Sequence, residues 1–280
     1  MDIYYSINGV NIGEAGFNSM DWVLLRAGTN PLGGVTKEIT KVTVPGYDGY
    51  FQAPSTRTEQ VLVLNIQSPR ENVEALMAVL SHVGYDTAFP TFGVLSVNAA
   101  TDQAAYFELV SALPSSTFPS DEKVTVTATL NIPYGGWRDT ETTETTASIT
   151  TNPTTVSVAS GISLPVRDMD VFIQGNVGTM QINDSAGSWL RTTGDYVYAS
   201  GNGIFYQGST GRAFKATTAS PWVATADLGF AVDVSGGGFK MTPKFNPAVP
   251  NTRAAELTVL STLLTDVSLT IRWRGAYVLR

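Results

Sequence analysis

The chain has 280 residues, a formal net charge of −7, 43% hydrophobic residues, 15% charged residues and no cysteine. This length suits one large or two ordinary domains with enough apolar material for packed cores. The negative charge argues against a surface that binds nucleic acid, because such a surface needs a basic face. Without cysteine, disulfides, thiolate metal sites and cysteine nucleophiles are excluded.

Targeting and membrane segments are not expected. No stretch approaches the roughly 18 consecutive apolar residues of a membrane-spanning helix, so we expect no membrane partner. The N-terminal stretch MDIYYSINGV lacks a basic segment followed by an apolar one, which argues against a cleaved secretion signal. Abundant Thr, Ser and Gly with few charged residues is typical of β-rich proteins with short strands and turns.

Residues 1–138 are predicted to form a first domain of strands with one helix. The segment EQVLVLNIQ, residues 59–67, is apolar at both alternating sets of positions, which predicts a central strand covered on both sides. The helix is predicted in SPRENVEALMAVLSHVG, with Ser68 as N-cap and Gly84 as its end. Its apolar residues recur at helical spacing, so we expect the helix to lie across a sheet.

A short turn motif separates two apolar runs early in the chain. It comprises Pro45, Gly46, Tyr47, Asp48 and Gly49. Two glycines and a proline in five residues predict a tight, shaped turn rather than a floppy loop. A calcium site at Asp48 is disfavoured because no D-x-D-x-D-G series surrounds it.

The remaining chain is predicted to be a linker followed by a second domain. Residues 139–157 are rich in threonine and poor in large apolar side chains, so we predict an inter-domain linker that drapes as an extended strand. Residues 158–280 contain short apolar runs about ten residues apart with Gly, Asn and Asp between them, which predicts a β-sandwich. For NTRAAELTVLSTLL we favour a strand over a helix.

Few residues suggest catalysis. The only histidine, His82, falls in the last turn of the predicted helix, where a structural role suffices. Asp168 and Asp170 would share one strand face, whereas paired catalytic carboxylates normally come from separate strands. The Gly-rich stretches at 201–203 and 208–212 lack the Gly-Lys-Ser/Thr of a phosphate loop and read as hairpin turns. We therefore expect no enzyme activity, no cofactor and no metal.

Aromatic and arginine residues in the second domain are the remaining candidates. Trp189 and Trp222 could build a core or an interface, or they could form a platform for a glycan, and these interpretations stay open. Arg272 and Arg274 alternate in TIRWRGAY. We expect both arginines to pair with acidic residues across a domain or subunit contact.

A series of motifs in residues 15–140 resembles a known family. The series is a strand with Trp22, then VPGYDGYF, the capped helix, GVLSVNAATDQAAYFELVSAL and VTVTATLNIPYGGWRD, which contains Trp137. Together they resemble the N-terminal domain of the distal tail (Dit) proteins of long-tailed bacteriophages. Relatives commonly carry a basic residue where this chain has Tyr47. The second half is similar in layout to the galectin-like or carbohydrate-module-like C-terminal domains of that family.

The resemblance implies a mainly β fold, with an N-terminal β-sandwich carrying one helix and a C-terminal β-sandwich. It also implies a homohexameric ring at the virion tail tip, assembled in the host cytoplasm, that joins the tail tube protein to the tail-associated hub protein. DNA would pass through the lumen without specific binding, because a wall of negative charge repels phosphates. The residues we assign to the subunit interface are Pro45, Gly46, Tyr47, Asp48, Gly49, Trp137, Arg272 and Arg274.

Two further functions remain alternatives. The first is a carbohydrate-binding adhesin in which the second domain contacts host cell-surface glycans through Trp189 and Trp222. The second is a remote one, a glycosidase that uses Asp168 and Asp170.

Overall fold

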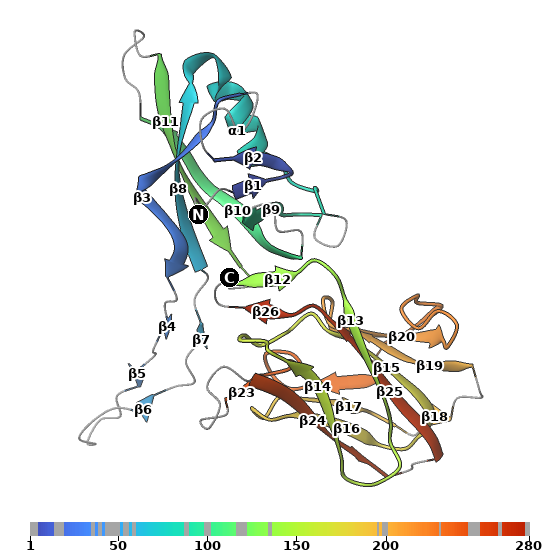
Figure 1. Cartoon of the computed structure of the whole chain (residues 1–280). Coiled ribbons are helices and arrows are strands. Elements are labelled where there is room, and N and C mark those ends of the chain that lie inside the picture. Colours follow the sequence, from blue (N-terminus) through green and yellow to red (C-terminus); the bar gives the residue numbers. More distant parts are fainter. Residues whose placement is uncertain are drawn as a thin grey trace. The chain divides into compact units, whose positions relative to one another are not determined.

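The computed structural model describes residues 5–13, 20–34, 37–38, 41–42, 51–52, 56–57, 60–86, 90–97, 102–115, 122–133, 136–194, 196–197, 201–229, 231–245, 253–262 and 265–277. The chain forms two compact units, one that reaches Thr140 and one that spans Glu141–Tyr277. Both units are built from antiparallel strands (Figure 1). The mainly β fold class predicted from the sequence is therefore confirmed.

The first unit is organised around one path of paired strands in the order β2-β1-β9-β10-β11-β8-β3, with β12 beside β10. The long strand β10 is shared by two parts of this path, because residues 105–107 pair with β9 and residues 108–114 pair with β11. The strands are β1 (Tyr5–Ile7), β2 (Val10–Ile12), β3 (Val23–Gly34), β8 (Gln60–Pro69), β9 (Gly93–Val97), β10 (Gln103–Pro114), β11 (Lys123–Ile132) and β12 (Trp137–Asp139).

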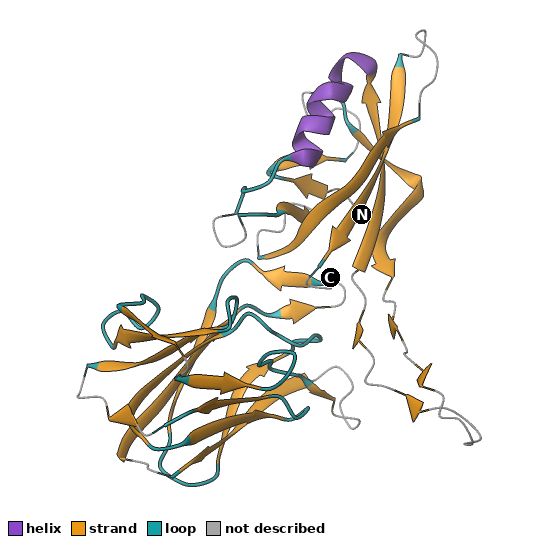
Figure 2. Cartoon of the chain, turned by 180° about the vertical axis from the view of Figure 1, so that it is seen from behind, coloured by secondary structure: helices purple, strands orange, loops and turns teal. Residues whose placement is uncertain are grey.

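One α-helix in the described part of the chain, α1 (Val73–Ser81), packs on β8, β10 and β11 (Figure 2). Leu76 and Leu80 point into the core, as the apolar stripe predicts. The chain turns extended at His82, and Gly84 takes the positive φ of +82° that glycine tolerates best. The predicted helix is thus confirmed, and His82 lies just beyond its last residue.

The predicted N-cap at Ser68 is wrong. Ser68 belongs to β8, where it is fully buried and lies opposite Val124 of β11. A short 3-10 turn, η1 (Arg70–Asn72), then leads into α1. The local Ser-Pro-x-Glu pattern suits a cap, but pairing with β11 extends the strand to Pro69.

Two short antiparallel pairs connect β3 to β8. They are β4 (Lys37–Glu38) with β7 (Thr56–Arg57), and β5 (Lys41–Val42) with β6 (Phe51–Gln52). The predicted turn at residues 45–49 falls in the sequence between β5 and β6 but lies outside the described residues.

The second unit is a sandwich of two antiparallel sheets. The first sheet has the order β13-β25-β15-β19-β20-β21, with β18 on β15, and the second has the order β14-β24-β16-β17-β22, with β23 on β24. The strands of the two sheets are β13 (Thr143–Ser148), β14 (Thr154–Ser160), β15 (Asp170–Val177), β16 (Met180–Asp184), β17 (Trp189–Thr192), β18 (Tyr196–Val197), β19 (Asn202–Gln207), β20 (Arg212–Thr217), β21 (Ala226–Gly229), β22 (Val232–Val234), β23 (Lys244–Phe245), β24 (Arg253–Ser261) and β25 (Thr265–Trp273). The short strand β26 (Ala276–Tyr277) follows β25 and belongs to neither sheet.

Alternation along the strands builds the core between the two sheets. One set of residues points inward and is fully buried, whereas its neighbours point outward, as period-two patterning requires. The fully buried set includes Ile173, Ile182, Leu190, Ile204, Leu257, Val259, Leu269 and Ile271. Strand β24 confirms the strand predicted in NTRAAELTVLSTLL. Within the described residues, no helix has the length and apolar character needed to cross a membrane.

The threonine-rich segment 139–157 contributes ordered strands to the second unit. Residues 143–148 form β13, which pairs with β25 over its whole length, and β14 begins at Thr154. Thr146 Oγ1 lies 3.0 Å from Thr270 Oγ1 across this pair. An outer strand needs few apolar side chains, because backbone hydrogen bonds and cross-strand threonine pairs hold it.

Candidate functional site

Within the described residues of the first unit, one face of strand β8 is only partly covered. In β8, Leu62, Leu64 and Ile66 are fully buried on the face that carries α1, whereas Val61 on the opposite face is 43% exposed. The prediction that this strand is covered on both sides therefore holds for one face only within a single chain. A strand face that leaves a large apolar residue such as Val61 exposed is a candidate for contact with something outside the chain.

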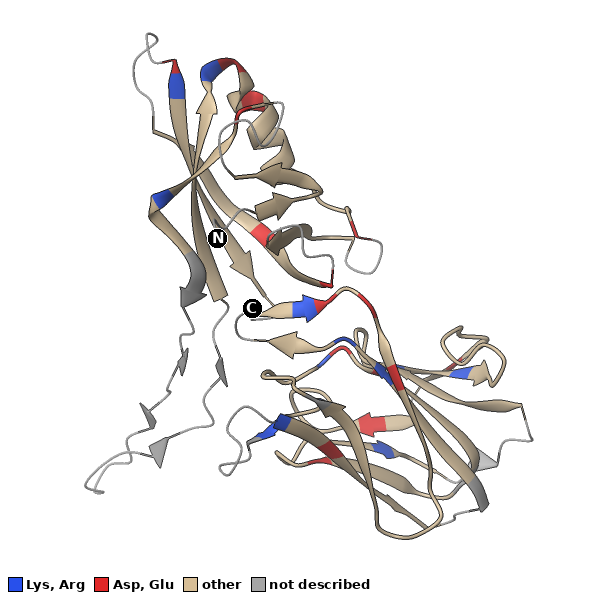
Figure 3. Ribbon diagram, viewed as in Figure 1, with Lys and Arg blue, Asp and Glu red and all other residues tan. Residues whose placement is uncertain are grey.

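This open face is polar but almost uncharged across its middle. By register, Thr125, Thr127 and Thr129 of β11 lie between the residues of β8 and those of β10. Charged side chains stand only at the two ends of the described β10–β11–β8 face, at Glu108 and Lys123 (Figure 3). Such a surface offers few groups that would hold a phosphate backbone.

Asn65 fixes the shape of the outer strand β3. Its Nδ2 donates to the carbonyl oxygen of Ala27 at 2.9 Å, and its Oδ1 accepts a hydrogen bond of 2.7 Å from Thr127. Its backbone N–H donates to Thr29 Oγ1 at 3.0 Å. Gly28 has a φ of +76°, and a Cβ there would lie 2.3 Å from Asn65 Nδ2. These contacts hold a bulge in β3, where the pairing register shifts between Leu25 and Asn30.

In the four-strand stretch β3-β8-β11-β10, the outer strands are β3 and the end of β10. In the described part of the chain, β3 pairs with β8 and otherwise makes only an isolated bridge from Val23 to Gly13, and the end of β10 from Glu108 onward pairs with β11 alone. Two large apolar residues stand on this end of β10, Val110 at 63% and Leu113 at 64% exposure. An edge strand with exposed apolar side chains is a template for pairing with another chain.

The residues predicted to form the subunit interface differ in how buried they are within the chain. Pro45 to Gly49 lie outside the described residues. Trp137, in β12, is 2% exposed, so its side chain is interior within the chain, and Arg274 is half-buried. Arg272 makes close contacts within the second unit.

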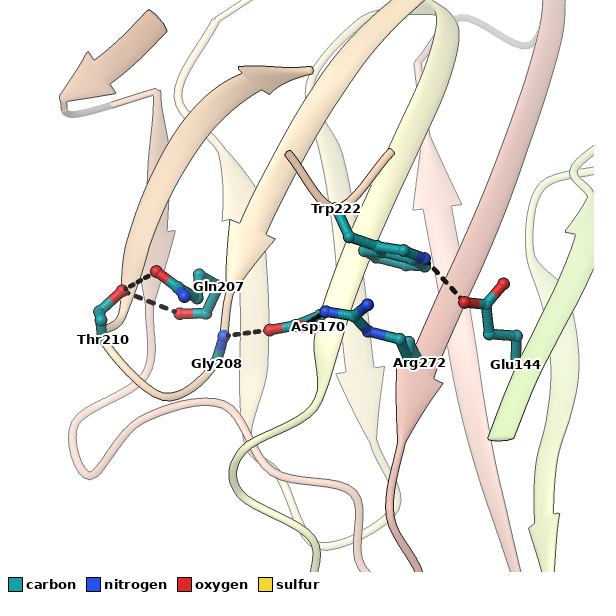
Figure 4. Close-up of polar contacts among 7 residues, drawn as sticks. All are labelled: Glu144, Asp170, Gln207, Gly208, Thr210, Trp222 and Arg272. Carbon is teal, nitrogen blue, oxygen red and sulfur yellow. Dashed lines mark hydrogen bonds and ion pairs between the residues drawn. The ribbon is translucent and has the colours of Figure 1, made fainter. Parts of the chain in front are cut away.

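Arg272 lies at the centre of a polar row across three strands of the first sheet of the sandwich. Glu144 and Asp170 are its direct cross-strand neighbours on either side, in β13 and β15. Its Nη2 donates to Asp170 Oδ2 at 2.7 Å, and its guanidinium carbon lies 4.5 Å from the ring centroid of Trp222 (Figure 4). We call Trp222, Arg272 and Asp170 the Trp222 trio.

Trp222 closes a small apolar cluster on the outer face of this sheet. Its ring meets Phe172 and Phe205 edge-on, at centroid distances of 6.5 and 5.8 Å. Both phenylalanines are buried although they point away from the sandwich core. The indole Nε1 donates to Glu144 Oε1 at 2.7 Å. One ring face, the ring edge and the N–H of Trp222 are therefore all engaged within the chain.

Asp170 is mostly buried, and burial raises the pKa of its carboxyl above the ordinary value of 3.8. The hydrogen bond and charge of Arg272 and the backbone N–H of Gly208, at 3.2 Å from Oδ1, oppose this rise. The alternative in which Asp168 and Asp170 act as catalytic acids is therefore disfavoured, because the direct partner of the Asp170 carboxylate is an arginine. A salt bridge across neighbouring strands explains Asp170 without catalysis.

The two Gly-rich stretches differ in structure. Gly208 to Gly211 connect β19 to β20, with Thr210 Oγ1 donating to Gln207 Oε1 at 3.0 Å. A Cβ at Gly208 would lie 2.1 Å from the carbonyl oxygen of Met169, so only glycine fits this approach of two backbones. Gly201, at φ +101°, precedes β19. The hairpin prediction is confirmed for the stretch that joins the antiparallel strands β19 and β20. It is wrong for residues 201–203, because Asn202 and Gly203 lie in β19, and β18 and β19 both pair antiparallel with β15.

A second tryptophan, arginine and aspartate meet on the other sheet. Trp189 and Arg191 point outward from β17, because Leu190 between them is fully buried. The guanidinium carbon of Arg191 lies 5.1 Å from the Trp189 ring centroid, and Arg191 Nη2 lies 3.3 Å from Asp233 Oδ2. We call Trp189, Arg191 and Asp233 the Trp189 trio. Since the two trios belong to different sheets, the structure does not bring Trp189 and Trp222 together as one platform.

In the described structure His82 has a structural contact, and no metal site is found. The carbonyl of His82 accepts a hydrogen bond of 3.1 Å from Asn8 Nδ2, which ties the end of α1 to the β1–β2 turn. Among the described residues, no group of three or more His, Cys, Asp or Glu side chains is placed to hold a metal ion.

No sequence pattern indicated the partners of the Trp222 trio. Glu144 lies in the threonine-rich segment, and Phe172 and Phe205 lie on short strands whose outward faces read as solvent-exposed. A pair of acidic residues flanking one arginine across three strands depends on register, which sequence periodicity alone does not define.

No family model and no curated protein sequence matches the chain. Among solved structures, the chain is similar to the crystal structure of the Dit protein of phage SPP1, described as a paradigm of the hub adsorption apparatus in phages that infect Gram-positive bacteria. The TM-score is 0.56 and the sequence identity 10%, over 98% of this chain and 99% of the other. The phage P2 baseplate in its activated conformation with Ca aligns over 97% of this chain and 98% of that one, at 10% identity and a TM-score of 0.38, which supports no further conclusion. The chain therefore has the fold of a phage Dit protein.

Proposed function

We propose that this protein is a structural component of a bacteriophage tail tip, in which six copies form a ring around the DNA channel. The Dit fold over nearly the whole chain supports a role in the tail baseplate. In this proposal the ring joins the tail tube protein to the tail-associated hub protein, and the chain performs no catalysis. The hairpin at residues 45–49 and Arg274 remain candidate contacts to neighbouring subunits.

The observation that carries the ring is the pair of sheet edges on the first unit. The strands β3, β8, β11 and β10 alternate in direction, so β3 and β10 run opposite to each other. When β3 of one copy lies beside β10 of the next, the new pair is antiparallel, as every other named pair is. Head-to-tail contacts of this kind close into a ring when the rotation per copy divides a full turn.

The open face of the same strands supports a channel lining. In a ring closed through these edges, β8 and β11 would present their uncovered face to one side of the wall and α1 to the other. The middle of that face carries threonine, asparagine and valine and no charge. DNA would slide past such a wall, because phosphate contacts require basic residues. The chain's net charge of −7 adds a repulsive field around it.

The test is the mass of the full-length protein in solution, measured by multi-angle light scattering, with negative-stain images of the same sample. We expect a six-fold ring for the wild type. Replacing Val110 and Leu113 together with lysine places two charges on the β10 edge and should convert rings to monomers. The matched control is Val223→Lys, an equally exposed valine of the second unit, at 60% exposure, which should leave the ring intact. Monomeric wild type that also fails to join purified tail tubes would contradict the proposal.

The adhesin alternative concerns the second unit and does not depend on ring formation. A glycan-binding second unit and a ring-forming first unit are compatible in one chain. The Trp189 trio is the observation that favours it.

A further inference from the structure

We propose that the outer face of the second sheet of the sandwich, centred on Trp189, is a binding surface for an uncharged saccharide. The inference deepens the adhesin alternative, on which it rests, and is independent of the tail-tip role. It begins with how the sheet arranges its outward side chains. Directly opposed residues of neighbouring strands point to the same face, so the register defines the surface.

Two adjacent rows of outward residues cross this sheet. One row runs from Thr155 of β14 through Thr258 and Asn183 to Trp189. The next row contains Leu260, Gln181, Arg191 and Asp233. Both rows are exposed or half-buried, whereas the residues between them, such as Ile182 and Leu190, are fully buried. The result is a flat patch that has an aromatic ring at one end and amide, hydroxyl, guanidinium and carboxylate groups around it.

The hydrogen-bonding capacity of this patch is mostly unused. Within the described residues, the indole N–H of Trp189 makes no hydrogen bond, and its backbone is satisfied by Ser235. Arg191 uses one of its five N–H donors, on Asp233 Oδ2. Gln181 Nε2 donates to Asn183 Oδ1 at 2.6 Å, which leaves Gln181 Oε1 and Asn183 Nδ2 for another partner.

These groups match the chemistry of a pyranose ring. A sugar presents an apolar C–H face that packs on an indole ring, and hydroxyls at its rim that both donate and accept hydrogen bonds. A paired Arg–Asp and a paired Gln–Asn offer donors and acceptors in the same plane without net charge. An anionic ligand fits less well, because Asp233 neutralises Arg191.

The loop beside Trp189 leaves room for such a ligand. Ser235 donates its backbone N–H to the carbonyl of Trp189, and the loop continues through Gly236, Gly237 and Gly238. A Cβ added at any of these three glycines would meet nothing within 4 Å. Three successive positions of this loop therefore carry no side chain, and the space around them is open.

The experiment uses the full-length protein on an array that carries neutral hexopyranose oligosaccharides together with sialylated, sulfated and phosphorylated glycans. We expect binding to at least one neutral class. Isothermal titration with the neutral oligosaccharide that binds best should show a loss of at least about tenfold in affinity for Trp189→Ala and for Asp233→Ala. Circular dichroism of each variant checks that the sandwich is folded.

Two controls separate this surface from the other tryptophan and from the ring. Trp222→Phe keeps an aromatic ring in the Trp222 trio and should bind the same sugar with unchanged affinity. The oligomer mass of Trp189→Ala should equal that of the wild type, so failure of one proposal is visible apart from the other. Binding restricted to anionic glycans, binding that survives Trp189→Ala, or no binding at all would overturn the inference.

Discussion

The second unit contains two trios of tryptophan, arginine and aspartate that share composition and differ in surroundings. In the Trp222 trio, Arg272 lies 4.5 Å from the ring centroid and 2.7 Å from Asp170, and the arginine and aspartate side chains are only 29% and 15% exposed. In the Trp189 trio the corresponding distances are 5.1 and 3.3 Å, and the side chains are 44% and 50% exposed. One trio stabilises the fold, and the other displays its groups to solvent.

The difference comes from what covers each tryptophan. Trp222 sits in the loop between β20 and β21, which folds back over Phe172 and Phe205, and Glu144 accepts its N–H. Trp189 lies on a strand, and its indole has no neighbour beyond Arg191 among the aromatic and hydrogen-bonding contacts of the described residues. An aromatic residue with all its contacts made inside the chain is structural, whereas one with unused contacts is a candidate for a ligand.

The largest expected difference in stability is between alanine variants of the two tryptophans. Trp222→Ala should lower the free energy of unfolding by about 3 kcal/mol, because it uncovers two buried phenylalanines and leaves a cavity on the sheet. Trp189→Ala should lower it by about 1 kcal/mol or less, since Trp189 is only half-buried and its ring contacts Arg191 alone among the aromatic and cation contacts of the described residues. Urea unfolding followed by circular dichroism measures both. Equal losses for the two variants would remove the distinction between the trios.

The two arginines give a second comparison. Arg272→Ala leaves the Asp170 carboxylate mostly buried without its partner and removes the cation from the Trp222 ring, so we expect a loss of about 2 kcal/mol. Arg191→Ala breaks an exposed pair and should lower stability by about 0.5 kcal/mol. Double-mutant cycles of each arginine with its tryptophan should show stronger coupling for the first pair, and the opposite order would contradict this assignment.

The pH dependence of stability sharpens the role of Asp170. Because burial raises the pKa of its carboxyl in the folded state above 3.8, the folded protein holds this proton more tightly than the unfolded chain does. The contribution of Asp170 to stability is therefore greatest below pH 3.8 and falls as the pH rises through the folded-state pKa. Asp170→Asn should gain stability relative to the wild type over that rise, as urea titrations at acidic and neutral pH will show. If the wild type instead became more stable relative to Asp170→Asn as the pH rises, the direction inferred for the pKa of Asp170 would be wrong.

The smallest effect is expected at Glu144. Glu144→Gln keeps an oxygen that accepts the hydrogen bond from Trp222 Nε1, so its stability should stay within about 0.5 kcal/mol of the wild type. Glu144→Ala removes the acceptor from an exposed position and should lower stability by about 1 kcal/mol. Thermal unfolding of both variants in parallel tests whether the hydrogen-bond acceptor or the charge of Glu144 stabilises the protein. A larger loss of stability for Glu144→Gln than for Glu144→Ala would contradict a role for the hydrogen bond from Trp222 Nε1.

Local patterns predicted many of the elements. The helical spacing of apolar residues placed α1, the apolar run of residues 59–67 placed β8, and short apolar runs separated by Gly, Asn and Asp indicated the strands of the second unit. The cap at Ser68 was a local prediction that failed, because β8 continues through that residue to pair with β11. The motif series of residues 15–140 pointed to the Dit fold that the structure has.

Sequence by itself determined that this protein is β-rich, that it has two parts, and that it lacks thiol chemistry, since composition and period-two alternation are local properties. Tertiary structure alone decided which tryptophan is covered and which is open, and that Arg272 lies between Glu144 and Asp170. The physical reason is register: residues far apart in the chain become neighbours only when strands pair, and a shift of one position would turn each side chain to the other face.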